Sequence, residues 1–140
     1  MLGAKFGFYD QTDWQTARKI DWIVDTWGEC LSADGAALFK TMMKGKAKKD
    51  AAYGEVLRTK WLPFLTALEE QLSVNRTRFL AGDTVTIADF CGYSICHNIF
   101  NNEQMGGQPQ YNHEFKKFSN LVEYAQTVEE EFRSFSASRR

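Results

Sequence analysis

Apolar residues recur at every third or fourth position along most of this sequence, and no segment alternates apolar with polar residues over the length of a strand. Such spacing gathers side chains on one face of an α-helix, whereas a half-buried strand needs a period of two. The pattern therefore predicts an all-α fold, a bundle of four to six helices without a sheet. Because 140 residues are about one domain's length, we expect residues 1–140 to form a single domain with a flexible tail at 136–140.

The first helix is expected to begin near Thr12 or Asp13, since either side chain can accept hydrogen bonds from N–H groups of the first turn. Its pattern extends to Met42, and we expect a bend or break near Gly28 or Gly35 because each glycine weakens a helix by about 1 kcal/mol. The apolar positions of this pattern are Trp14, Ala17, Ile20, Val24, Trp27, Leu31, Ala36, Phe39 and Met42.

A second helix is expected after the lysine-rich connector at residues 43–50, with Asp50 as its cap. Pro63 lies inside its pattern and removes one backbone donor, which predicts a kink rather than a break. The apolar positions of this second pattern are Val56, Leu57, Trp61, Phe64, Leu65, Leu68 and Leu72. Further along, we expect a loop at residues 101–110 and a last helical region that breaks near Ser119.

The most specific local pattern is the segment Ala81–Phe90. Thr86 is placed to cap a third helix, and Asp89 three residues later can complete a capping box. Val85 and Phe90 flank this start at the spacing of a hydrophobic staple. Because the capping box accounts fully for Asp89, we interpret this residue as structural rather than as a catalytic acid.

The residues that could carry chemistry do not form a known catalytic or metal-binding pattern. Cys91 and Cys96 are five positions apart and His97 follows them, whereas zinc ligands on a helix need a spacing of three or four and further donors. No catalytic triad order and no phosphate-binding loop occurs. We therefore predict no catalytic residue and no metal. Three cysteines and no signal-like N-terminus predict reduced thiols and a cytoplasmic location.

The overall charge gives little attraction to polyanions, since 17 Lys and Arg residues stand against 18 Asp and Glu residues. Lys44, Lys46, Lys48 and Lys49 lack interleaved aromatic residues, so we interpret them as a solvated connector and consider nucleic acid an unfavoured partner. No apolar run is long enough to span a bilayer.

Tryptophan is the residue type that points to a partner. Trp22 lies off the apolar stripe of its helix, where an exposed tryptophan favours a protein interface. We group Trp14 of the same helix with it, and we expect other protein subunits as partners.

Residues 79–90, FLAGDTVTIADF, resemble the most recognisable stretch of the glutathione transferase C-terminal domain, in which a Gly-Asp turn precedes a Thr/Ser-x-Ala-Asp helix start. Asp21–Thr26 resembles the run that opens this domain in sigma-class transferases. Phe118–Leu121 stands where the family has Phe-Pro-x-Leu, and residues 2–9 are similar to the end of the preceding thioredoxin-like domain. The resemblance implies the all-helical C-terminal domain, with residues 1–11 as a remnant of the inter-domain segment.

Members of this family bind glutathione mainly through the thioredoxin-like domain, which holds the thiol-activating residue, and no segment of these 140 residues corresponds to it. We therefore expect no cofactor and no conjugation by the chain alone. Our first hypothesis is a non-catalytic protein-interaction or scaffold subunit of a larger complex. The alternative is the hydrophobic-substrate half of a glutathione transferase, active in conjugation or prostaglandin-type isomerisation once a thioredoxin-like half supplies the glutathione site.

For that alternative the resemblance implies particular positions. Glu29, with Asp25 beside it, corresponds to the acidic position that reaches the glutathione ammonium across the dimer in sigma-like relatives. The same two residues are also explained as solvated helix carboxylates. Phe39, Met42 and Met43 would line the pocket for a hydrophobic acceptor.

Overall fold

The computed structural model describes residues 2–103 and 108–137, and every regular element in these ranges is a helix. The elements are α1 (Leu2–Lys5), α2 (Trp14–Thr41), α3 (Lys46–Val56), η1 (Leu57–Trp61), α4 (Leu62–Asn75), α5 (Ile87–Ser94), η2 (Ile95–Phe100), α6 (Gln108–Phe115) and α7 (Ser119–Ala137). The segments α3, η1 and α4 follow one another without a gap and form one long rod, and α5 continues directly into η2. The predicted all-α fold is confirmed, and the described ranges contain no strand.

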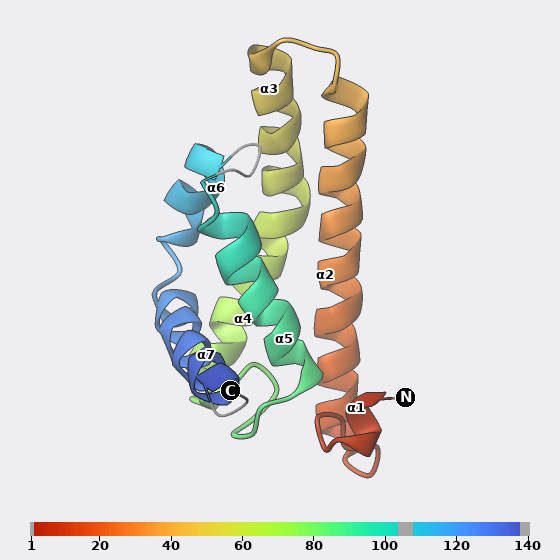
Figure 1. Ribbon diagram of the computed structural model, residues 1–140, viewed down its shortest axis with the longest axis vertical. Helices are drawn as coiled ribbons and strands as arrows, with labels where there is room; N and C mark the ends of the chain where they lie inside the picture. Colours follow the sequence, from red (N-terminus) through yellow and green to blue (C-terminus); the bar gives the residue numbers. More distant parts are fainter. Residues whose placement is uncertain (1, 104–107, 138–140) are drawn as a thin grey trace.

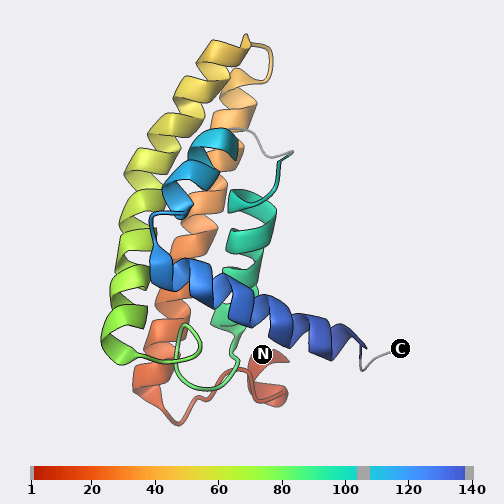
Figure 2. The ribbon, with the colours of Figure 1, turned by 90° about the vertical axis from the view of Figure 1, so that its left-hand side faces the viewer.

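The long rod and α2 lie antiparallel, side by side, and form the tall hairpin seen in Figure 1. The α5–η2 segment packs against α2, and α6 packs against η2. Figure 2 shows α7 crossing the bundle obliquely, where it contacts α4 and α5. In Figure 1, α2 forms one edge of the bundle, with α6 and α7 at the opposite edge.

The start of α2 is fixed by Asp13. Its carboxylate accepts hydrogen bonds from the backbone N–H groups of Gln15 and Thr16 at 3.1 and 3.2 Å, which satisfies donors that have no partner within the helix. The helix then runs without interruption past Gly28 and Gly35, so the expectation of a break is wrong, and the alternative of a bend stays a prediction. Burial of one whole face against α3 and α5 outweighs the propensity lost at the two glycines.

The long rod begins earlier than predicted and is continuous. Its first helical residue is Lys46, after Gly45, so Asp50 is not the cap but a residue inside α3. The backbone changes to π-helical hydrogen bonding at η1, and Pro63 follows as the second residue of α4. Pro63 therefore sits in the first turn of an α-helical stretch, where the missing N–H is tolerated.

The C-terminal boundaries agree only in part with the sequence pattern. The break near Ser119 is confirmed, because α6 ends at Phe115 and α7 begins at Ser119. The expected loop at 101–110 is wrong at its end, since α6 begins at Gln108, while residues 104–107 lie outside the described residues. Helix α7 also takes in residues 136 and 137 of the expected tail, and 138–140 lie outside the described residues.

The N-terminus of α7 is satisfied by a side chain from α4. The Glu69 carboxylate accepts from the backbone N–H groups of Asn120 at 3.0 Å and Leu121 at 2.9 Å. A carboxylate at this end also complements the positive end of the helix dipole. Glu69 therefore joins the start of α7 to α4.

Asp34 is a buried carboxylate at the centre of the bundle. Its Oδ2 accepts from the indole N–H of Trp61 at 2.8 Å, and its Oδ1 accepts from the Tyr111 hydroxyl at 2.6 Å. Burial raises the pKa of the Asp34 carboxyl, although both hydrogen bonds favour the ionised form. Asp34 thus ties α2 to η1 and to α6 in one network.

Asp89 holds the start of α5 in a capping box with Thr86. The backbone N–H and the hydroxyl of Thr86 both donate to Asp89 Oδ2, at 2.8 and 3.1 Å. Asp89 Oδ1 accepts from the Leu80 N–H at 3.0 Å and from the Tyr124 hydroxyl at 3.1 Å. The fully buried carboxylate therefore joins α5 to the preceding loop and to α7.

The ring contacts of Phe90 involve residues other than Val85, its expected partner in the hydrophobic staple. Phe90 is exposed on one side and packs its ring against Phe8 at 5.3 Å and against Phe132 at 4.8 Å. Val85 packs against the core. The contact between Val85 and Phe90 stays a prediction.

The packing around Gly92 gives a stability prediction with a built-in control. A Cβ at Gly92 would lie 2.8 Å from Leu80 Cδ1 and also too close to the Tyr124 hydroxyl, whereas a Cβ at Gly28 meets nothing within 4 Å. We expect Gly92→Ala to lower the free energy of unfolding by about 1–3 kcal/mol and Gly28→Ala to raise it by about 0.5–1 kcal/mol. Urea denaturation at pH 7 measures both, and shifts of the same sign would contradict the packing described.

Candidate functional site

The predicted interface residues lie on one exposed strip of α2. Trp14, Arg18 and Trp22 are spaced by four, and Asp25 and Glu29 continue the same strip, so all five share a helix face. We call these five residues the α2 outer face. All five residues are exposed, and the solvent-accessible fraction is 64% for Trp14 and 39% for Trp22. This helix forms an edge of the bundle in Figure 1.

Both tryptophans of the α2 outer face are held by neighbours. The Trp22 ring meets the ring of Phe64 in α4 edge to face, with centroids 5.7 Å apart. The Arg18 guanidinium lies 5.7 Å from the centroid of the Trp14 ring. Arg18 and Trp22, together with Lys19, also line a small cavity of about 350 Å³. Because these contacts already restrict the rotamers of both side chains, less conformational entropy is lost when a partner binds.

The two carboxylates of this face are open to solvent. Glu29 makes a long ion pair with Lys60 at 3.8 Å, which contributes little when both groups are exposed. Nearby, Asp21 accepts a hydrogen bond from the Tyr9 hydroxyl at 3.0 Å. Within the described residues no three carboxylate, histidine or cysteine groups converge to hold a metal ion. The glutathione contact by Glu29 and Asp25 stays a prediction.

Phe39, Met42 and Met43 lie at the other end of α2, on an open surface. The periodic pattern predicted an apolar face that included Trp14, Ala36, Phe39 and Met42, and that prediction is wrong for these four residues because all are exposed. A period indicates which residues share a face, but not whether another element covers it. The acceptor pocket that these residues would line stays a prediction.

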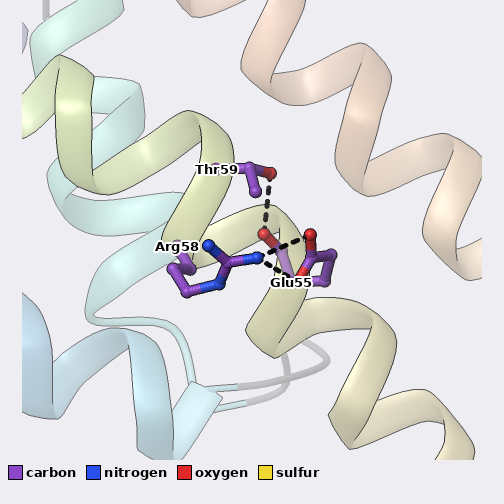
Figure 3. Close-up of polar contacts among 3 residues, drawn as sticks. All are labelled: Glu55, Arg58 and Thr59. Atoms are coloured by element: carbon purple, nitrogen blue, oxygen red, sulfur yellow. Dashed lines mark hydrogen bonds and ion pairs between the residues drawn. The ribbon is translucent and has the colours of Figure 1, made fainter.

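One cavity that the sequence pattern did not indicate lies between the long rod and α6. It has a volume of about 550 Å³, and its lining residues are Gly54, Leu57, Arg58, Leu62, Pro109, Gln110, His113 and Glu114. Figure 3 shows that the Arg58 guanidinium is engaged by Glu55, with its Nη2 at 2.9 and 2.8 Å from the two carboxylate oxygens. The Thr59 hydroxyl donates to the Glu55 carbonyl in the same turn. The cation at this cavity is therefore already paired.

A second, more polar cavity of about 600 Å³ lies between the end of α4 and α7. Residues 76–78 and Asp83 line one side, and Asn120, Glu123 and Thr127 of α7 line the other. Arg76 has a left-handed backbone, with φ of 51°, and closes the C-terminus of α4 by donating to the Leu72 carbonyl at 3.0 Å. No sequence motif predicted this cavity, because its walls are far apart in the chain.

The three thiols are poor nucleophiles where they stand. Burial raises the pKa of the Cys30 and Cys91 thiols to about 11 and that of the Cys96 thiol to about 12. At neutral pH these groups are protonated, and the thiolate is the reactive form. None of the three forms a disulfide.

Comparison with known proteins gives one match. The family model described as glutathione S-transferase, C-terminal domain, matches residues 34–133. No curated protein and no solved structure matched the chain. No described helix combines the length and apolar composition needed to cross a bilayer. The family match covers most of the sequence and agrees with the all-helical fold, so this chain belongs to the glutathione S-transferase C-terminal domain family.

Proposed function

We propose that this glutathione S-transferase C-terminal domain is a protein-interaction module, a non-catalytic subunit that joins a larger complex through the α2 outer face. The observation that carries this proposal is the pair of exposed tryptophans, Trp14 and Trp22, on an edge helix. Tryptophan is enriched among the residues that dominate binding energy at protein interfaces.

The arrangement of the α2 outer face fits this role. Trp14 and Trp22 are eight residues apart, which on an α-helix is about 12 Å along the axis. Arg18, Asp25 and Glu29 surround them with charge of both signs. Apolar anchors within a polar rim are typical of interfaces between separately stable proteins. Because Trp22 is already held by Phe64, its immobilisation costs less on binding.

The alternative, an acceptor-substrate half of a glutathione transferase, receives less support. Phe39, Met42 and Met43 are all exposed, whereas a small-molecule site encloses most of its ligand. Calorimetric titration with glutathione, first of the chain alone and then with a thioredoxin-like half added, separates the two functions. Both functions predict no heat of binding for the chain alone, and we expect none after the addition either. Binding that appears only with the added half would favour the enzymatic alternative.

The interaction is tested by purifying the chain from its own cell extract under native conditions, followed by native mass spectrometry. Wild type is expected to carry a stoichiometric protein partner, and Trp14→Ser is expected to weaken its retention by about thirtyfold. Trp22→Ser should do the same, but it also removes a contact with Phe64, so Trp14→Ser is the cleaner variant.

The matched controls are Phe6→Ser and Val74→Ser, which remove exposed apolar side chains outside the α2 outer face. Both are expected to retain the partner, and circular dichroism should show native helix content in all variants. A strictly monomeric wild-type chain, or equal loss in variants and controls, would overturn the proposal.

A further inference from the structure

The hairpin between α2 and α3 ends in a surface unlike the rest of the molecule. We call residues 38–50 the hairpin tip. Figures 1 and 2 both show it as the far end of the α2–α3 hairpin, projecting beyond α6 and the α5–η2 segment. The hairpin tip shares no residue with the α2 outer face, which ends at Glu29.

The hairpin tip exposes large apolar side chains at its apex. Phe39 is 79% exposed and Met43 is 92% exposed, and Leu38 and Met42 beside them are also exposed. Side chains this open cannot line a cleft, so the tip is a convex apolar surface. Exposed apolar residues in a group mark a site of interaction, whereas scattered ones do not.

The hairpin tip is also strongly cationic. It contains five lysines, Lys40, Lys44, Lys46, Lys48 and Lys49, and one acidic residue, Asp50. Asp50 pairs with Lys46 at 3.0 Å, and the structure gives the other four lysines no ion pair within the described residues. The tip thus has a net charge of +4 in a chain whose net charge is −1. The remainder of the molecule is correspondingly acidic.

We propose that the hairpin tip binds anionic lipid membranes, with Phe39 and Met43 entering the headgroup region and the lysines lying against the lipid phosphates. Apolar side chains that enter this boundary, beside lysines that meet anionic lipid, are the two contributions that hold proteins at a membrane surface. The charge of the tip complements that surface, and the acidic remainder orients the molecule so that only the tip approaches it.

The observations favour lipid over other polyanions. A nucleic acid backbone would pair with the lysines but would leave Met42, Met43 and Leu38 in water. A protein groove would have to enclose a convex apex, whereas a bilayer interface deforms around it. The inference does not depend on the proposed function, because the lysines and apolar residues of the tip are separate from Trp14 and Trp22.

The test is flotation of the full-length chain with vesicles of phosphatidylcholine alone and of phosphatidylcholine with 30% phosphatidylserine (roughly the anionic content that gives a surface potential of tens of millivolts). Binding is expected only to the anionic vesicles and should fall steeply in high salt, because the lysine attraction is screened. Lys44→Gln with Lys48→Gln should weaken binding by about fivefold per lysine. Phe39→Ser with Met43→Ser should weaken it at least tenfold.

The controls place matched substitutions away from the tip. Lys5→Gln with Lys116→Gln matches the charge change, and Phe6→Ser with Val74→Ser matches the apolar change at exposed positions. Both are expected to float like wild type. Equal flotation with neutral vesicles, no flotation at all, or equal loss in controls would overturn the proposal. Tip-dependent binding to duplex DNA or to polyglutamate, without flotation, would also overturn it.

Discussion

Replacing Asp89 with alanine is expected to lower the free energy of unfolding by about 3–5 kcal/mol, a large part of the stability of a domain of this size. The Asp89 carboxylate is fully buried and accepts from Leu80, from Tyr124 and twice from Thr86. Alanine leaves these donors without a partner, and each unsatisfied buried donor costs about 1–3 kcal/mol. Urea denaturation followed by circular dichroism measures the loss.

Two further variants make this prediction specific. Asp89→Asn keeps the shape but replaces one accepting oxygen with a donor, so we expect a smaller loss of about 1–3 kcal/mol. Asp83→Ala removes an exposed carboxylate six residues earlier and should change the free energy of unfolding by no more than about 0.5 kcal/mol. A loss at Asp89 no larger than that at Asp83 would show that the buried network contributes little.

The second large effect is expected at Trp61. Its side chain is fully buried, meets the ring of Phe100 edge to face at 5.4 Å, and donates to Asp34. We expect Trp61→Ala to lower the free energy of unfolding by about 3–5 kcal/mol, because the cavity cannot close around so large a deletion. Trp61→Phe keeps a six-membered ring but removes the indole donor and the buried atoms around it, so its loss combines the hydrogen bond to Asp34 with a smaller cavity.

The cost of Trp61→Phe is expected to grow with pH. Burial already holds the pKa of the Asp34 carboxyl above its ordinary value of 3.8, so the folded protein keeps a proton that the unfolded chain releases. The contribution of Asp34 to the free energy of unfolding is therefore largest below pH 3.8 and is lost as the pH rises through the raised pKa of the folded protein. Without the indole donor the pKa of Asp34 rises further, so the difference from wild type should stay constant at low pH and widen once the pH exceeds the pKa of Asp34 in the folded wild type. A difference that is independent of pH would contradict this account.

Local signals predicted the parts of the fold that depend on neighbouring residues. Asp13 and Thr86 begin their helices as expected, because capping involves groups only a few positions apart. Asp34 gave no such signal, since its partners Trp61 and Tyr111 are 27 and 77 residues away. The sequence pattern also missed η1, because π-helical bonding follows from tertiary packing and not from a residue motif.

The surfaces were harder to predict than the core. Trp22 was recognised because it departs from the apolar stripe of α2, a feature visible in the spacing. The lysines at residues 44–49 were interpreted as a solvated connector because no aromatic residue is interleaved with them, whereas in the structure the exposed Phe39 and Met43 lie in the same hairpin tip. The family match begins at residue 34, after the Asp21–Thr26 run, so the sigma-class resemblance stays a prediction.

The wide π-helical turn η1 determines which side of α4 faces the core, relative to the side that α3 buries. Tyr53, Leu57, Trp61 and Leu65 are all buried and are spaced by four. On a regular helix with 3.6 residues per turn, a spacing of four drifts by about 40° at each step, which would carry the last of them well away from the first. A turn that takes in more residues absorbs this drift, so both halves of the rod present their large side chains to one core. Shortening residues 57–61 by one would turn α4 about its axis and expose Leu65 and Leu68.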